Sequence, residues 1–258
     1  MVHILLTNDD GIGAPGLLAL AARARALGRV TIVAAERERS GIGHAVTLNG
    51  AMRCRRLPDD GTATRYACDA TPADCVKLAV SRLARGGIDL VLSGINPGAN
   101  VGVSVLYSGT VAAAVEAGMY GLPAASVSLA NGGAEPTRPA FDRAADIAVE
   151  LVEQLLREGV LGSSPLNINV PLLKAGWPLG WRAARQSLAA YDDRFEVAGA
   201  PEVYRLSPDD TRREVHLDTD LALLEQGYVT VTPLTFDLTD RQALAALRRA
   251  ARAIAEEA

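Results

Sequence analysis

Short apolar runs alternate with segments of helical periodicity along the chain up to residue 171. Apolar runs bounded by glycine or polar turns predict buried strands. These predicted strands lie at residues 3–7, 30–35, 88–93, 124–128 and 166–170. Apolar residues at helical spacing predict helices between them. The predicted helices lie at residues 17–27, from 71 onward, 108–120 and 141–157. Repeated strand–helix–strand units favour right-handed crossovers, so we predict a Rossmann-like α/β fold with a mostly parallel sheet and helices on both faces.

The pattern changes after residue 171. Residues 172–217 lose the alternation and carry both tryptophans, and the segment RFEVAGAPEVYRL is typical of a β-hairpin. A last strand is expected at 227–234 and a helix at 241–257. We therefore predict a core, residues 1–171, that carries the functional site. Residues 172–258 are expected to form a C-terminal arm used for oligomerisation rather than an independent domain.

Composition narrows the classes of partner. Hydrophobic residues make up 49% of the chain but aromatic residues only 4%, so aliphatic side chains and alanine must fill the core. A net charge of −4 lacks the basic excess of a nucleic-acid-binding surface. No stretch approaches the ~18 consecutive apolar residues of a membrane span. We expect no nucleic-acid partner and no membrane insertion.

The three cysteines, Cys54, Cys68 and Cys75, form no CxxC motif. An odd and unclustered set is typical of reduced thiols in a reducing compartment. Together with an N-terminus that lacks the features of a signal peptide, this predicts a cytoplasmic protein.

Polar residues gather where three of the predicted strands end. The first strand leads into Asn8–Asp9–Asp10–Gly11, the second into Glu36 and then Arg39–Ser40–Gly41, and the third into Ser93–Asn100. Ligands of open α/β sheets bind outside the carboxyl ends of the strands. These three loops are therefore expected to converge on one site.

Asp9 and Asp10 are adjacent carboxylates at the end of a buried strand, and they repel unless a cation or a proton neutralises them. Mg²⁺ and Mn²⁺ prefer oxygen ligands, and Ser40 and Asn96 offer neutral ones. The alternative is that the two aspartates only build a turn or cap the next helix, since Asp is common in turns.

A helix is predicted to open at Ser108–Gly109–Thr110, where free backbone N–H groups and the helix dipole favour a phosphate. The alternative is ordinary N-capping by Ser108. His44, in the loop after Ser40, is a candidate proton donor to a leaving group, although a plain polar loop histidine is the simpler interpretation. His3 and His216 are expected to be structural.

One motif favours a different protein. Gly11–Gly16 reads GIGAPG, which matches GxGxxG after a strand, and Glu36 follows near the ~20-residue spacing of a ribose-binding acid. This fingerprint predicts an NAD(P)-binding oxidoreductase. Against it, the aspartate doublet directly before the glycines would repel a pyrophosphate in the absence of a metal.

At these residues the sequence resembles the SurE (survival protein E) family of nucleotidases. The matching segments are ILLTNDDGIGAPG, AAERERSGIGHAVTL, TPADCVKLA, DLVLSGINPGANVG, YSGTVAAAVEAG, LNINVP and DTDLALLEQGYVTVTPL. The resemblance implies a phosphomonoesterase that removes phosphate from nucleoside 5′- and 3′-monophosphates and also acts on short polyphosphate. It implies one divalent ion, Mg²⁺ or Mn²⁺, per subunit, with Asp9, Asp10, Ser40 and Asn96 as ligands. It also implies a homodimer or homotetramer. This chain has Ser104 where the family often carries an acidic residue.

Our hypothesis assigns catalysis to Asp9, Asp10 and Asn96, with the metal polarising the phosphoryl group and orienting a water. Backbone N–H groups near Gly41 and at 108–110 would stabilise the developing charge. A covalent phosphate on Asp9 is the alternative, but the chain lacks the DxD spacing that usually accompanies it. A metal-dependent nucleotide sensor without catalysis is a further alternative.

Overall fold

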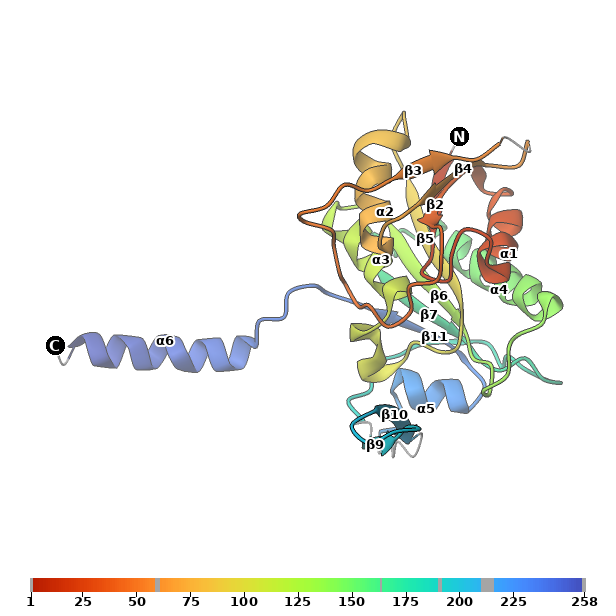
Figure 1. The fold of residues 1–258 in the computed structure, drawn as a ribbon. Coiled ribbons are helices and arrows are strands. Elements are labelled where there is room, and N and C mark those ends of the chain that lie inside the picture. The colour runs from red at the N-terminus through yellow and green to blue at the C-terminus, as the bar shows by residue number, and fades with distance from the viewer. Residues whose placement is uncertain (1, 59–60, 163, 190–191, 210–215, 257–258) are drawn as a thin grey trace.

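The structure is a computed structural model that describes residues 2–58, 61–162, 164–189, 192–209 and 216–256. Its centre is a nine-stranded sheet, shown in Figure 1. In sheet order the strands are β3 (Cys54–Arg56), β4 (Thr64–Cys68), β2 (Gly28–Ala35), β1 (Val2–Thr7), β5 (Leu90–Pro97), β6 (Ala124–Leu129), β7 (Leu166–Val170), β11 (Val229–Pro233) and β8 (Trp181–Ala183). The strands from β4 to β7 are all parallel, whereas β3 and β11 pair antiparallel with their neighbours β4 and β7.

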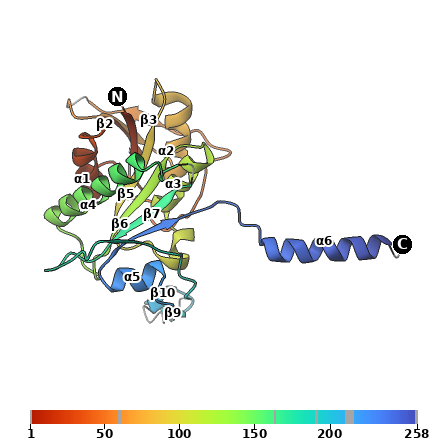
Figure 2. The ribbon, with the colours of Figure 1, turned by 180° about the vertical axis from the view of Figure 1, so that it is seen from behind.

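Helices cover both faces of this sheet. Helices α1 (Pro15–Ala24) and α4 (Arg138–Arg157) pack together on one face, and α2 (Pro72–Leu78) and α3 (Gly109–Met119) lie on the other (Figures 1 and 2). Strand β1 shows why: Ile4 and Leu6 join the core under α1 and α4, while Leu5 joins the core under α2 and α3. Alternate side chains of a strand point to opposite faces, so an apolar run suits a sheet buried on both sides. The predicted Rossmann-like α/β class is confirmed.

The helix starts predicted at Thr71 and Ser108 are also confirmed. Thr71 caps α2 in a capping box, since its hydroxyl accepts the backbone N–H of Asp74 and the Asp74 carboxylate accepts the backbone N–H of Thr71. Ser108 caps α3 by accepting the backbone N–H of Val111 at 3.1 Å. Strand β5 differs from its expected bounds of 88–93. β5 continues through Gly94 to Pro97, a stretch that we expected to be a loop, because Asn96 and Pro97 still pair with β6.

The segment after residue 171 contributes both to the sheet and to projections from it. Strands β8 and β11 extend the sheet beyond β7. The predicted hairpin is present as β9 (Asp192–Val197) and β10 (Tyr204–Asp209), near the short helix α5 (Asp220–Glu225). The final helix α6 (Arg241–Glu256) extends away from the body of the molecule (Figure 1). No helix in the described part of the chain is both long and apolar enough to cross a membrane.

The expectation of three reduced thiols is wrong. Cys54 and Cys68 form a disulfide, and only the buried Cys75 is a free cysteine among the described residues. The reason is the register of β3 and β4, which places Cys54 directly opposite Cys68 on adjacent antiparallel strands. Cysteine usage therefore gives no support to a reducing compartment.

Candidate functional site

The candidate site lies at the carboxyl end of β1, where the sheet topology changes direction. From β1 the chain first builds β2 and β4 on one side and then returns to build β5 on the other. Such a switch point leaves a crevice in which open α/β sheets bind ligands. Asp9 and Asp10 follow β1 directly, and Asn96 lies on β5 next to it.

Asp9 is buried and is held by the start of α3. It is 4% exposed, and Thr110 donates its hydroxyl hydrogen to Asp9 Oδ1. Burial raises the pKa of Asp9 above its ordinary value, and this is opposed by the Thr110 hydroxyl and by backbone N–H groups that include those of Thr110 and Gly109. A Cβ at Gly109 would lie 2.8 Å from Asp9 Oδ2, so only glycine lets the helix start approach this closely. The predicted anion-favouring helix start is thus directed at Asp9 itself.

The Asp10 side chain is partly buried, and one of its carboxylate oxygens lacks a hydrogen bond within the described part of the chain. Its Oδ2 atom is buried with no hydrogen-bond partner among the described residues. Burial first, and then the charges of Asp9, Glu38 and Glu135, raise the pKa of Asp10 to about 7. Two neighbouring carboxyl groups in this state bind a cation or a proton in preference to remaining charged and unpaired. The pair is therefore suited to hold a divalent ion.

Ser40 is brought toward the aspartates by its neighbour in the chain. The backbone N–H of Arg39 donates to the carbonyl oxygen of Asp9 at 2.7 Å, which ties the loop after β2 to the end of β1. The Ser40 hydroxyl donates to Glu38 Oε1 at 2.7 Å. The charge of Glu38 also raises the pKa of Asp10. Glu38 is therefore a common neighbour of Ser40 and Asp10.

A β-bulge in β5 sets the direction of the Asn96 side chain. Gly94 pairs with Val127 and Asn96 with Ser128, so Ile95 is an extra residue on β5, and such bulges redirect side chains. Ile95 is buried in the core, whereas Asn96 is half-buried and donates its Nδ2 hydrogen to the carbonyl oxygen of Gly98 at 2.7 Å. This bond leaves the amide oxygen of Asn96 as the atom that can face a cation.

The loop beyond Asn96 is fixed by buried amides of β7. Asn169 Oδ1 accepts the backbone N–H of Asn100 at 2.8 Å. The Nδ2 groups of Asn167 and Asn169 donate to the carbonyl oxygen of Asn100 at 2.7 and 3.1 Å. Both backbone polar groups of Asn100 are therefore satisfied inside the protein, which gives this loop a single position.

The oxygen-rich composition of the site sets what it can bind. No three His, Cys, Asp or Glu side chains gather as a metal-binding group in the described part of the chain. None of the hydrogen bonds described there joins Ser40 or Asn96 to either aspartate. Two carboxylates with a neutral hydroxyl and amide form a hard oxygen set, which suits Mg²⁺ or Mn²⁺ better than zinc.

Comparisons with known proteins agree with this geometry. A family model described as Survival protein SurE matches residues 4–193. The chain belongs to the SurE family. A protein named 5′-nucleotidase SurE from Pelobacter propionicus is 42% identical over 93% of this chain and 95% of its own length, and one of the same name from Alkalilimnicola ehrlichii is 42% identical over 95% and 93%. The crystal structure of the SurE protein from Aquifex aeolicus superposes with a TM-score of 0.83 at 34% identity, over 96% of this chain and 98% of that one.

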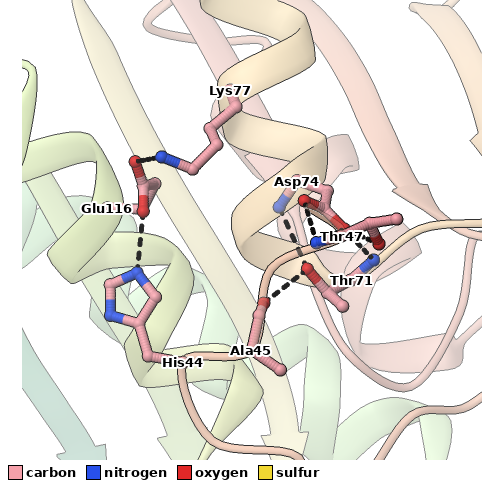
Figure 3. Close-up of polar contacts among 7 residues, drawn as sticks. All are labelled: His44, Ala45, Thr47, Thr71, Asp74, Lys77 and Glu116. Carbon is pink, nitrogen blue, oxygen red and sulfur yellow. Dashed lines mark hydrogen bonds and ion pairs between the residues drawn. The ribbon is translucent and has the colours of Figure 1, made fainter. Parts of the chain in front are cut away.

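His44 lies in the same loop as Ser40 but further along α3. Its Nε2 atom is 2.7 Å from Oε2 of Glu116, a buried carboxylate whose other oxygen accepts from Lys77 at 2.6 Å (Figure 3). Glu116 follows Thr110 by about 9 Å along the helix axis at a rise of ~1.5 Å per residue. In this member of the SurE family His44 therefore anchors its loop to α3, and no described contact joins it to Asp9.

A second anchor of this loop lies at the start of α2. Asp74 accepts the backbone N–H of Thr47 at 3.0 Å and its hydroxyl at 2.7 Å, while Thr71 donates its hydroxyl to the carbonyl oxygen of Ala45 at 2.8 Å (Figure 3). Burial alone would raise the pKa of Asp74, but the hydrogen bonds that Thr47 and Thr71 make to it lower the pKa below its ordinary value. The loop between Ser40 and Thr47 is thus held at both α2 and α3.

The glycines of the GIGAPG segment have structural roles that differ from one another. Gly11 has a φ of +105°, and a Cβ at Gly16 would lie 2.1 Å from the carbonyl oxygen of Ile95. Gly13 has open space around its Cβ position. The close approach of α1 to β5 therefore accounts for Gly16, and this spacing does not require a dinucleotide.

Four residues of this SurE-family site were missed in the sequence or given another role. Asn8, which is buried, donates to the carbonyl oxygen of Gly11 at 3.1 Å, and the side chain of Thr110 binds Asp9. Glu38 and Glu135 act on Asp10 through their charge. Asn8 stands beside the aspartate doublet and Glu38 two residues before Ser40, so position gave a signal for both. Glu135 lies in a loop with no recognisable motif.

Proposed function

We propose that this SurE-family protein is a divalent-metal-dependent phosphomonoesterase that hydrolyses nucleoside 5′-monophosphates to nucleoside and phosphate. The observation that carries the proposal is the Asp9–Asp10 pair, which is largely buried, lies at the switch point of the sheet and has an unpartnered carboxylate oxygen. Relatives named 5′-nucleotidase SurE align over more than nine-tenths of the chain, which supports the same activity here.

The residues present fit one divalent ion per subunit. Asp9 and Asp10 would supply charged oxygens, and Ser40 and Asn96 would supply neutral ones. A bound Mg²⁺ or Mn²⁺ would neutralise the carboxylates and withdraw electrons from the phosphoryl group. Without an ion, the raised pKa of Asp10 means that a proton takes its place near neutral pH.

The chain's own groups then orient the reaction. Thr110 and the backbone at Gly109 fix the orientation of Asp9. The start of α3 would present its positive dipole end to the phosphoryl group. Backbone N–H groups near Gly41 and at Ser108 would stabilise charge on the phosphoryl oxygens, and those of Gly109 and Thr110, which bind Asp9, would do so by sharing their hydrogens with it.

Water is the proposed nucleophile rather than Asp9. One oxygen of Asp9 already accepts from Thr110, and the other lies against Gly109, which supports a role as a ligand rather than as a nucleophile. A covalent phosphate on Asp9 would need that group to turn out of this arrangement. His44 is kept as a minor candidate for protonating the leaving oxygen, because it belongs to the loop that carries Ser40.

The finer parts of the proposal concern substrate range and assembly. Nucleoside 3′-monophosphates and short polyphosphate are further proposed substrates. A homodimer or homotetramer built through residues 172–258 is supported by α6, which leaves the body of the molecule and exposes Leu247 and Ile254. Apolar side chains on a projecting helix favour burial against another subunit.

The deciding experiment measures phosphate release from 5′- and 3′-nucleoside monophosphates with Mn²⁺, with Mg²⁺ and with EDTA. Release that needs a metal and disappears in Asp9→Asn is the expected result. The wild type and the variant should show the same melting behaviour in EDTA apart from the effect of the lost charge. A folded, metal-loaded wild type that binds nucleotide without releasing phosphate would instead identify a sensor.

A further inference from the structure

A polar pocket lies at the amino ends of the strands, whereas Asp9 and Asp10 follow the carboxyl end of β1. It encloses about 440 Å³ where β1 and β2 begin. Its lining is rich in cationic side chains, namely Arg29, Arg56, Arg82 and Arg85. Because the whole chain carries a net charge of −4, four arginines around one pocket are a local reversal of its average charge.

The floor of this pocket is built from buried polar side chains. His3 is 3% exposed and Thr31 is 5% exposed, and His3 Nε2 lies 2.8 Å from Thr31 Oγ1. The backbone N–H of His3 donates to Asp89 Oδ2 at 2.8 Å, which places one carboxylate beside the floor. Polar groups that are buried and bonded to one another give the pocket a fixed base.

The arginines reach the pocket from different elements. Arg29 lies on β2, and its guanidinium lies 2.8 Å from Nδ1 of His3 in the floor and donates to the carbonyl oxygen of Arg85 at 3.3 Å. Arg82 belongs to η1 (Ala79–Leu83), a turn of helix that follows α2, and Arg85 comes shortly after it. In the described part of the chain, no ion pair joins Arg29, Arg82 or Arg85 to a carboxylate. Guanidinium groups that share one pocket repel one another until an anion separates them.

We propose that this pocket binds a small anion that carries a diphosphate group. Arginine is suited to phosphate because its planar fork makes two parallel hydrogen bonds to the oxygens. Three guanidinium groups, one from β2 and two from the segment around η1, match the several charges and the length of a diphosphate better than those of a single phosphate. The bounded pocket and the acidic chain favour a small ligand over an extended nucleic-acid backbone.

This site is separate from the proposed catalytic site. His3 is the second residue of β1 and Asp9 follows its end, so six residue-to-residue steps of extended chain separate them, which is about 20 Å at ~3.3 Å per residue. A ligand in the arginine pocket therefore does not touch Asp9 or Asp10. The inference does not depend on the proposed phosphatase activity.

The test is calorimetric titration of the full-length protein with inorganic pyrophosphate and with ADP, in EDTA at low ionic strength. We expect both ligands to bind the wild type, and the double variant Arg82→Gln, Arg85→Gln to bind at least about tenfold more weakly, which corresponds to ~1.4 kcal/mol. The matched control is Arg143→Gln, Arg205→Gln, which removes the same two charges from exposed positions outside the pocket. Its affinity should stay close to that of the wild type, and so should that of Asp9→Asn.

The outcomes separate the sources and the failures. Binding of both ligands shows that the diphosphate group suffices, and binding of ADP alone shows that the ligand is a nucleotide. The proposal is overturned by a wild type that binds neither ligand or by equal affinities for the wild type and the Arg82, Arg85 variant. It is also overturned if both double variants lose affinity alike, or if Asp9→Asn abolishes binding. Circular dichroism and thermal melts of each variant establish that it is folded.

Discussion

Thr110 donates its hydroxyl hydrogen to Oδ1 of Asp9 across 101 residues of sequence. The bond joins the first turn of α3 to the end of β1, and it fixes the rotamer of a carboxylate that is 4% exposed. Partners that orient ligand carboxylates in this way typically change metal affinity or activity by about 10–100-fold when they are removed.

Thr110→Val tests this bond. Valine keeps the shape of threonine and removes only the hydroxyl, so kcat with saturating Mn²⁺ should fall by about tenfold or more. The Mn²⁺ concentration needed for half-maximal rate should rise as well. Thr110→Ser restores the donor and should recover most of the activity. Equal rates for the wild type and Thr110→Val would remove this residue from the mechanism.

Gly109→Ala tests the close approach of the helix to Asp9. The new Cβ would lie 2.8 Å from Asp9 Oδ2, so the carboxylate or the helix start must move. We expect a large loss of activity with little change in the melting temperature. Gly13→Ala is the matched control, because nothing lies within 4 Å of its Cβ position. Similar losses in the two variants would contradict this account.

The fold and the general position of the site were predictable because they depend on local patterns. Apolar runs at 3–7 and 124–128 predicted buried strands, and carboxyl ends of parallel strands meet at one edge whatever the order of the strands. Asp9, Asp10 and Asn96 were therefore expected to come together. The N-cap roles of Thr71 and Ser108 follow from residues within one helical turn.

Other features depend on the register and pairing of distant segments. The Cys54–Cys68 disulfide requires the register of two short strands, β3 and β4. The pairing of β11 with β7 is antiparallel, which no periodicity in either strand could indicate. Glu135 reaches the surroundings of Asp10 from a loop without a motif, so its effect on the pKa was not predictable.

The metal-free protein should lose stability as the pH rises toward 8. Asp10 has a pKa of about 7 in the folded state and an ordinary value of 3.8, so the folded protein takes up a proton between these pH values. The associated stability is present at acid pH and is lost as the pH passes 7, which amounts to about 2–3 kcal/mol between pH 5 and 8 at ~1.4 kcal/mol per pKa unit.

Urea unfolding in EDTA at pH 5 and pH 8 measures this effect. Because other carboxyl groups titrate as well, the informative quantity is the difference between wild type and Asp10→Asn. The variant should lack most of the decline, and Mn²⁺ should restore the wild type at pH 8. A wild type and variant with parallel pH profiles would show that Asp10 is ionised without a metal.

Asn169→Leu tests the amide that positions the loop after Asn96. The change leaves the buried backbone N–H of Asn100 without its acceptor, which costs about 1–3 kcal/mol in the free energy of unfolding. Thr230→Val is the matched control on the adjacent strand β11, because the buried Thr230 hydroxyl has no partner among the described residues. That change should be neutral or slightly stabilising. The two variants are compared by urea unfolding at one pH.

The carboxylate of Asp74 takes part in two structures at once, since it completes the capping box of α2 and receives both polar hydrogens of Thr47. Neither structure can open while the other keeps its full set of bonds. The first turn of α2 and the chain around Thr47 should therefore exchange their amide hydrogens with solvent at a common rate, as one cooperative unit. The loop that carries Ser40, at its end near Thr47, should therefore open as rarely as the first turn of α2, although it has no regular structure of its own.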